Sequence, residues 1–483
     1  MPGAVLFVAT EFAWFFLIVL PLAWLTRPHL GLWQVTMIVA GLVFYGWWRR
    51  GEEDWWILGT IPGRYCAYLL LFAIVNQGLA LLAARWRAGG RSSIAVVAAC
   101  VFDLGALFWF KYAEWGVSQL NERVGTELRL GQIILPIGIS FIAFQALGYV
   151  IDVHRGEQAP VSLGDFTSYL LFFPHIVAGP LVRVSEFVPQ LYTRADPRHV
   201  DASRAMLLIA SGFIKKVVIS SFVFKEIVEP VFANPTAYGA VDNLVATYAY
   251  AVQIYCDFSG YTDIAIGLAL LMGIRFPQNF DNPYRALSMQ EFWRRWHMTL
   301  SRWLRDYLYI GLGGNRRGPG RTYLNLFLTM LIGGLWHGAN TTFVIWGALH
   351  GGALAIERWF TGRWPVSAGP AGPVFRWLAT FHVVCLGWIF FNARTTGVAL
   401  DMIGQILGVL RFDLGPSTQF ASLGLLLVIL LVLAWQFVPE AAGPRLVAAF
   451  SRLPAVSQGI IVGMVMVVCY RFGSVDEFIY FQF

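Results

Sequence analysis

The chain has 483 residues, of which 57% are hydrophobic, 16% aromatic and only 13% charged. Soluble domains carry about 25% charged residues, so this composition excludes an ordinary soluble enzyme. The net charge of +7 comes from Lys and Arg that lie in short connections between apolar runs, which is typical of membrane proteins and does not imply a nucleic-acid partner. We therefore expect an all-α protein in a lipid bilayer, with residues 1–483 forming one domain.

The predicted elements are apolar runs long enough to cross a bilayer, which takes about 20 helical residues. They predict roughly ten to thirteen transmembrane helices, with the longest runs counting twice. The runs cover residues 12–26, 28–48, 65–84, 92–110, 130–151, 205–233, 243–274, 322–356, 377–393, 413–438 and 455–470.

The stretch 166–182 is free of charge, but its sequence does not favour a continuous helix. It contains Pro174, His175, Gly179 and Pro180. Irregular backbone at membrane depth is tolerated only where protein or a wet cavity surrounds it. We therefore predict a re-entrant segment here.

Two carboxylates, Asp257 and Asp263, interrupt the apolar run 244–274, with Tyr261 between them. Charged groups at such depth are expensive, and they pair with other charges or line a path for ions or substrates. We expect pairing with arginines inside the bundle rather than catalysis.

Residues 287–310 have the spacing of an amphipathic helix lying near a membrane surface. One face carries Phe292, Trp296, Leu300, Trp303 and Tyr307, and another carries Arg294, His297, Ser301 and Arg305. The basic face could anchor the helix to anionic lipid head groups. It could also receive a phosphate-bearing donor such as coenzyme A or a phosphopantetheine arm, because arginine binds phosphate bidentately.

The run 322–356 lacks Asp, Glu, Lys and Arg, yet it contains His337 and His350. His337 stands near the middle in the sequence GGLWHGAN, where glycines permit close approach of a ligand or of other backbone. A neutral imidazole could take a proton from an attacking hydroxyl and return it to a leaving thiolate. The alternative is a structural histidine held by hydrogen bonds.

The chain ends in FIYFQF, which usually forms an aromatic belt at the membrane interface. If this tail folds back, the Tyr480 phenol could accept an acyl group transiently. The five cysteines have no spacing suited to zinc, and we expect no metal site.

Four segments together resemble the membrane-bound O-acyltransferase family. They are FFPHIVAGPLVR from Phe172, QIYCDFSGYTDIAIG from Gln253, FWRRWHMTLSRWLRDY from Phe292 and LIGGLWHG from Leu331. The FIYFQF ending resembles the bacterial branch, which includes alginate and peptidoglycan O-acetylation proteins and, more distantly, the D-alanyl transferase of teichoic acids.

The resemblance implies a ring of helices around a thin centre, with His337 as the catalytic histidine and His297 as the second motif residue. It makes Tyr480 a candidate acyl relay. It also implies a cytoplasmic thioester donor, either acetyl-coenzyme A or an acyl carrier protein, with no tightly bound cofactor. The expected acceptor is a polysaccharide, reached with a periplasmic serine esterase of the SGNH type as partner.

We therefore expect a bacterial inner-membrane O-acyltransferase. Its substrate or donor channel is expected to include Trp336, Asn340, Arg294, Ser301, Arg305, Asp257, Tyr261 and His175. D-alanyl transfer from a carrier protein is an alternative, as are a transporter or flippase using the buried aspartates and histidines and a non-catalytic scaffold.

Overall fold

The computed structural model describes residues 7–47, 61–130, 133, 135–177, 179–193, 196–361, 372–408 and 422–472. Within these ranges the chain forms helices and no strand, which confirms an all-α protein. The chain divides into two compact units. Unit 1 comprises residues 1–209 and 261–277, and unit 2 comprises residues 210–260 and 278–483. The prediction of one domain remains a prediction.

Unit 1 contains the first nine helices and the start of the tenth. They are α1 (Thr10–Thr26), α2 (Leu30–Trp47), α3 (Ile61–Trp86), α4 (Ser92–Leu107), α5 (Ala113–Val124), α6 (Ile139–Arg155), α7 (Leu163–Leu170), α8 (Phe173–Ile176), α9 (Val184–Leu191) and α10 (Ala202–Phe213).

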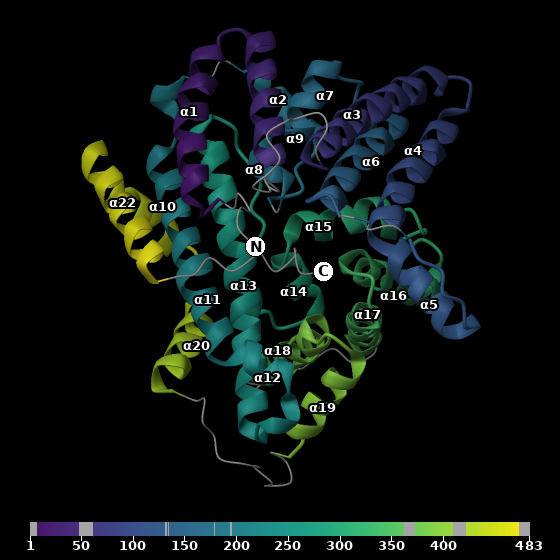
Figure 1. Ribbon diagram of the computed structural model, residues 1–483, viewed down its shortest axis with the longest axis vertical. Helices are drawn as coiled ribbons and strands as arrows, with labels where there is room; N and C mark the ends of the chain where they lie inside the picture. The colour runs from purple at the N-terminus through teal and green to yellow at the C-terminus, as the bar shows by residue number, and fades with distance from the viewer. Residues whose placement is uncertain are drawn as a thin grey trace. The chain divides into compact units, whose positions relative to one another are not determined.

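Helices α3, α4 and α6 pack side by side in unit 1 (Figure 1). Small residues let them approach closely, since Ala73, Ala80 and Ala99 are fully buried. Asn76 of α3 donates a 2.9 Å hydrogen bond to Oδ1 of Asp103 of α4, so one oxygen of this buried carboxylate is partnered. This bundle is a scaffold.

Unit 2 contains the end of α10 and the helices that follow it. They are α11 (Ser221–Val223), α12 (Glu229–Ala233), α13 (Ala240–Leu271), α14 (Met289–Arg295), α15 (Met298–Trp303), α16 (Gly318–His337), α17 (Thr341–Thr361), α18 (Gly372–Asn392), α19 (Thr396–Ile406), α20 (Leu423–Trp435), α21 (Ala442–Phe450) and α22 (Ala455–Phe472). The last eleven residues of α13 belong to unit 1.

Several helices of the described chain contain π-helical turns, in which the hydrogen bonds span five residues. Three of these stretches matter here: η3 (Ile214–Ser220) and η4 (Phe224–Val228) lie between α10 and α12, and η7 (Leu304–Tyr309) continues α15. As a result, residues 202–233 form one unbroken helical stretch.

Among the described residues, five helices are long and apolar enough to cross a membrane, or six if the bent pair α21 and α22 is one span. Three shorter apolar helices, α1, α2 and α20, add to them. The number of such helices is smaller than the predicted ten to thirteen. Part of the reason is that α16 and α17 have sufficient length, but their glycines, histidines and charges lower their mean hydropathy. Exposed apolar side chains such as Leu430, Leu431 and Val467 fit contact with lipid.

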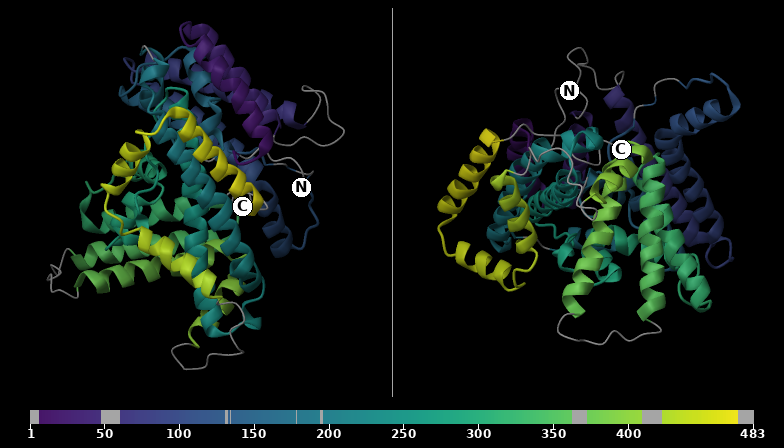
Figure 2. Two further views of the ribbon diagram at one scale, coloured as in Figure 1. Left: turned by 90° about the vertical axis from the view of Figure 1, so that its left-hand side faces the viewer. Right: turned by 90° about the horizontal axis from the view of Figure 1, so that it is seen from below.

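The long apolar run 322–356 forms two helices, α16 and α17, that lie side by side in unit 2 (Figure 2). The turn between them follows His337 directly. The run thus contains two helices, and the prediction that each of them crosses the membrane remains a prediction.

Two predicted interruptions can be compared with the structure. The stretch 166–182 is not one continuous helix, as predicted, because it contains the end of α7, the short helix α8 and non-helical backbone at residues 179–182. Its re-entrant path remains a prediction. The predicted continuous helix over 287–310 is wrong, because α14 ends at Arg295 and α15 begins at Met298. Its aromatic face is not in an interface either, since Phe292, Trp296 and Leu300 are each at most 2% exposed and pack in the core of unit 2.

Candidate active site

His337 is the last residue of α16, and aromatic rings surround its side chain. Only 5% of the residue is exposed. The ring centroids of Trp336, Trp346 and Phe391 lie 4.9, 5.0 and 5.1 Å from that of the imidazole, at angles of 72° to 84°. This arrangement keeps bulk water away from the imidazole.

Glycines allow α16, the turn and α17 to approach closely at this point. A Cβ on Gly334 would lie 2.3 Å from the Phe343 carbonyl oxygen, and one on Gly338 would lie 2.2 Å from the Phe343 ring. On the facing helix, a Cβ on Gly347 would lie 2.5 Å from the Met330 carbonyl oxygen. The prediction that glycines beside His337 permit close approach of other backbone is therefore confirmed.

Asn340 holds the turn that follows His337. Its side-chain amide donates to the Arg394 carbonyl at 2.9 Å, and its carbonyl accepts from the Thr342 backbone N–H at 3.1 Å. The second contact caps the start of α17 in the manner of an N-terminal capping residue. Asn340 thus positions the backbone next to His337, and its predicted place in a channel remains a prediction.

His297 stands in the break between α14 and α15, with its backbone in the left-handed region at φ 42°. Its Nδ1 lies 3.1 Å from Oδ1 of Asn279, an oxygen that also accepts hydrogen bonds from the backbone and hydroxyl of Thr299. The Phe258 ring meets the imidazole edge-on at 4.7 Å. A left-handed residue cannot continue a right-handed helix, so this conformation explains the break.

One residue of α18 contacts aromatic neighbours of both histidines. The Trp388 ring lies 4.9 Å from Trp296, which precedes His297, and 5.4 Å from Phe391, which contacts His337. The two histidines therefore border one aromatic core in unit 2. Direct support of His337 by His297 remains a prediction.

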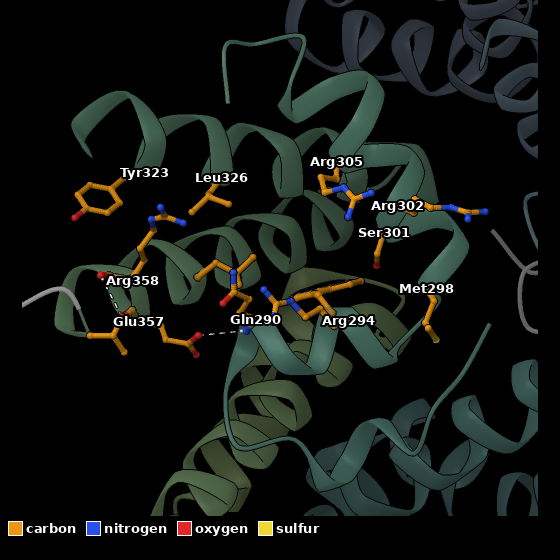
Figure 3. Close-up of a pocket in the computed structure, with 13 residues that line it drawn as sticks. Gln290, Arg294, Met298, Ser301, Arg302, Arg305, Tyr323, Leu326, Glu357 and Arg358 are labelled. Atoms are coloured by element: carbon orange, nitrogen blue, oxygen red, sulfur yellow. Dashed lines mark hydrogen bonds between the residues drawn. The ribbon is translucent and has the colours of Figure 1, made fainter. Parts of the chain in front are cut away.

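A basic pocket of about 790 Å³ opens between four segments of unit 2, and we call it the arginine pocket (Figure 3). Side chains of α14, α15 with η7, α16 and α17 converge on it (Figure 3). Its lining residues are Gln290, Trp293, Arg294, Met298, Ser301, Arg302, Arg305, Tyr323, Leu326, Leu354, Glu357, Arg358 and Thr361. The structure thus brings together the predicted residues Arg294, Ser301 and Arg305.

Sequence reasoning missed the contributions of Arg302 and Arg358 to this pocket. Arg302 belongs to neither of the two faces predicted for residues 287–310. The π-helical stretch η7 begins two residues later and changes which side chains share a face. Arg358 comes from α17, and only its place just after the apolar run 322–356 marks it in the sequence.

The only carboxylate that lines the arginine pocket in the described chain is Glu357, and it is already engaged. It accepts hydrogen bonds from the backbone N–H groups of Met289 and Gln290 at 2.5 and 3.3 Å. These are the first groups of α14, where a helix carries partial positive charge. Four guanidinium groups line the arginine pocket against this one carboxylate, so its lining is positive on balance, although Arg305 also pairs with Asp306 at 2.6 Å.

Five predicted channel residues are not among those lining the arginine pocket: Trp336 and Asn340, described above, and His175, Tyr261 and Asp257. His175, in unit 1, lies with Nε2 2.7 Å from the Tyr169 carbonyl oxygen, and Tyr261, also in unit 1, stacks on Phe7 at 4.6 Å. Asp257, in unit 2, forms a buried ion pair with Lys216. The expectation of an arginine partner for Asp257 is therefore wrong. The lysine reaches it from the π-helical stretch η3, which packs against α13.

Tyr480 lies outside the residues that the structure describes, so its predicted role as an acyl relay remains a prediction.

Together, these features describe a helical membrane protein whose unit 2 carries a buried histidine and a basic pocket. Comparison with known proteins identifies the family. Residues 86–397 match the membrane-bound O-acyltransferase family, and the chain belongs to it. It is therefore a membrane-bound acyltransferase.

Curated relatives agree with this assignment. The chain is 43% identical to the probable alginate O-acetylase AlgI of Pseudomonas aeruginosa, over 83% of this chain and 75% of the relative. It is 32% identical to the peptidoglycan O-acetyltransferase of Helicobacter pylori, over 80% of this chain and 76% of the relative. It is 31% identical to the teichoic acid D-alanyltransferase of Streptococcus thermophilus, over 53% of this chain and 68% of the relative.

Proposed function

We propose that this acyltransferase moves an acetyl group from a cytoplasmic thioester toward hydroxyls of a cell-envelope or exported polysaccharide, in the inner membrane of a bacterium. The observation that carries this proposal is His337, enclosed by aromatic rings at a helix end, in the same unit as the arginine pocket. The names of the relatives that acetylate alginate and peptidoglycan support the acetyl group and the polysaccharide.

In the proposed reaction, Nδ1 or Nε2 of the neutral His337 imidazole accepts the proton of an acceptor hydroxyl. The hydroxyl oxygen attacks the thioester carbonyl, a C–O bond forms and the C–S bond breaks. The imidazolium then gives its proton to the departing thiolate, and the products are an ester and a thiol. The ring of aromatic side chains excludes water, which would otherwise compete as the nucleophile.

The donor in this proposal is acetyl-coenzyme A or a phosphopantetheine arm on an acyl carrier protein. Both carry phosphate, which guanidinium groups bind through paired N–H donors. The arginine pocket supplies four such groups: Arg294, Arg302, Arg305 and Arg358. Lipid head groups remain the alternative ligand for the same charges.

Tyr480 in this proposal accepts the acetyl group from the donor and passes it on, and a periplasmic serine esterase of the SGNH type completes transfer to the polysaccharide. The support for both is the family resemblance of the sequence FIYFQF.

The test is incubation of the purified protein in detergent with acetyl-coenzyme A radiolabelled in the acetyl group. Thioester cleavage and covalent label are measured for the wild type, His337→Ala and Tyr480→Phe. Loss of cleavage in His337→Ala supports the proposed base, and loss of label with Tyr480→Phe supports the relay. Wild-type activity that survives in His337→Ala would overturn the assignment of the base.

A matched control is His382→Ala, which removes another histidine of unit 2. His382 lies on α18, and its Nε2 is 2.8 Å from the Tyr248 hydroxyl, outside the shell of His337. This variant should retain cleavage. If it loses cleavage together with His337→Ala, the loss reflects general damage to unit 2.

D-alanyl transfer is a second candidate, and the similarity to the teichoic acid D-alanyltransferase supports it. The same incubation with a D-alanyl carrier protein separates the two. Turnover of the D-alanyl thioester, with none of acetyl-coenzyme A, would replace acetyl transfer by D-alanyl transfer.

A further inference from the structure

Helices α3 and α4 of unit 1 pack side by side, and the turn between them is rich in arginine (Figure 1). We call residues 61–107 the α3–α4 hairpin. Arg85 stands in the last turn of α3, Arg87 follows that helix, and Arg91 precedes α4. The backbone N–H of Arg91 donates to the carbonyl of Trp86 at 3.2 Å, which closes the turn. Arg85 and Arg91 therefore lie at the same end of the hairpin.

The C-terminal end of α6 packs against this turn. The Arg87 guanidinium donates a hydrogen bond to the carbonyl of Val153. The Ser92 hydroxyl, at the start of α4, lies 2.7 Å from Nδ1 of His154. These contacts hold the ends of α3, α4 and α6 together as one surface.

The charge of this surface is positive on balance. Residues 85–91 and 152–157 together contain four arginines and two carboxylates, of which Asp152 is buried. All four arginines are exposed. The guanidinium groups of Arg85 and Arg91 have no hydrogen-bond or ion-pair partner among the residues that the structure describes. Two cationic groups are therefore open to a ligand.

A stripe of exposed apolar side chains runs along each helix of the hairpin and ends at one of these two arginines. On α3, Ile74, Leu81 and Arg85 share one face at helical spacing. On α4, Arg91 stands three residues before a stripe that repeats every three or four residues. The members of that stripe are Ile94, Val97, Val101 and Leu104. Only 22% of the most apolar window of the helix Ser92–Val124 is buried in protein.

The order of residues along the hairpin matches the layers of a lipid leaflet. Both helices are apolar and long enough to cross a membrane, so their exposed stripes lie at the depth of the acyl chains. Trp86 ends α3, and tryptophan is enriched where the bilayer meets water. The two arginines follow at the level of the head groups. A phospholipid has the same order, with an anionic group above two apolar chains.

We propose that the α3–α4 hairpin binds an anionic phospholipid, with the phosphate held by Arg85 and Arg91 and the acyl chains along the two apolar stripes. Guanidinium groups bind phosphate oxygens through paired N–H donors. Basic groups at a membrane surface also attract anionic lipids. The site belongs to unit 1, whereas His337 and the arginine pocket belong to unit 2, and it does not depend on the proposed acyl transfer.

The experiment titrates the purified full-length protein in detergent with phosphatidylglycerol or phosphatidylcholine of the same acyl chains. Native mass spectrometry counts the lipid molecules bound. Both lipids carry a phosphate, but only phosphatidylglycerol has a net charge. The wild type should bind one phosphatidylglycerol more tightly than it binds phosphatidylcholine. Arg85→Gln and Arg91→Gln should each weaken binding of phosphatidylglycerol about fivefold, and the double variant about thirtyfold.

The matched control is the double variant Arg445→Gln/Arg452→Gln, which removes two exposed arginines of unit 2. It should bind both lipids as the wild type does, and elution volume on size exclusion checks that each variant keeps its fold. An equal loss in the control and in Arg85→Gln/Arg91→Gln would overturn the inference, because net charge rather than a site would then explain the binding. Equal affinity of the wild type for the two lipids would overturn it as well.

Two further outcomes identify other occupants. Glycerol 3-phosphate has the phosphate without the acyl chains, and the wild type should bind it roughly a hundredfold more weakly than phosphatidylglycerol, because the chains supply much of the affinity. Equal affinity would replace the phospholipid by a free phosphate. A wild type that elutes as a dimer and binds neither lipid would assign the apolar stripes to a second copy of the chain.

Discussion

His175 and His337 both stand beside glycine in apolar segments, yet the chain surrounds them differently. The His175 ring N–H donates to the Tyr169 carbonyl at 2.7 Å, and its ring stacks on Phe276 at 5.5 Å. His337 lies instead among ring edges supplied by α17 and α18 as well as by its own helix. The hydrogen bond of His175 to a carbonyl six residues earlier holds its own turn in place, whereas the rings around His337 come from α16, α17 and α18. The proposed function makes His337 the imidazole that faces the substrate. The sequence around each histidine does not reveal this difference.

The largest effect should come from His337→Gln, which keeps a polar side chain of similar size but removes the proton acceptor. We expect the rate of acyl transfer to fall by about 10²- to 10⁴-fold, the usual contribution of a general base. Turnover is measured with radiolabelled acetyl donor, and elution volume on size exclusion checks that the fold is kept. A His337→Gln variant with wild-type turnover would make His337 a structural histidine like His175.

His175→Ala should give the opposite pattern. Because the variant leaves the buried Tyr169 carbonyl without this donor, we expect the free energy of unfolding to fall by about 1–3 kcal/mol. The rate per folded molecule should stay at the wild-type value. Thermal inactivation in detergent measures the loss of stability, and turnover normalised to folded protein measures the rate per folded molecule. Lost turnover at full stability would assign His175 to the site after all.

Arg358→Gln tests whether the arginine pocket, which lies in the same unit as His337, binds the donor. We expect the donor KM to rise roughly tenfold at low salt, the loss of one charge-assisted hydrogen bond, with kcat nearly unchanged. The effect should shrink at high salt, where the remaining charges are screened. Arg445→Gln removes an exposed arginine of α21 outside the pocket and is the control. Equal changes in both variants would indicate a general surface charge rather than a site.

The smallest effect concerns two tryptophans near His337. Trp388→Phe loses the hydrogen bond to Tyr284 and should lower the free energy of unfolding by about 1 kcal/mol more than Trp346→Phe does. The Trp346 indole nitrogen has no such partner in the described part of the chain. Chemical denaturation in detergent measures the difference. A larger loss in Trp346→Phe would show that its nitrogen already has a partner in the folded protein.

The helical class and most helix positions could be predicted from the sequence, because apolar length and spacing are local properties. The break at His297 could not, since it depends on Asn279, 18 residues away, accepting three contacts. The partner of Asp257 was missed for a similar reason. Lys216 lies 41 residues from Asp257, in a run that we interpreted as an ordinary transmembrane helix. It belongs to the π-helical stretch η3, whose turns change the direction of its side chain.

The candidate site was predictable only in part. The sequence pointed to His337 as a deep titratable group and to the arginines of α14 and η7 as one basic face. Arg358, Trp346 and His350 come from α17, and their positions depend on how α17 packs against α14 and α16, which no local spacing reveals.

Helix α13 has 32 residues, so at about 1.5 Å per residue it is roughly 48 Å long, well beyond the roughly 30 Å hydrocarbon core of a bilayer. A lipid-facing helix of that length must tilt, kink or thicken the membrane around it. In α13, 83% of the most apolar window is buried in protein, compared with 22% in the helix Ser92–Val124. A change in lipid acyl-chain length should therefore affect the helix Ser92–Val124 of unit 1 far more than α13, which carries Asp257 and Phe258. Acyl transfer should accordingly tolerate reconstitution into bilayers of different thickness.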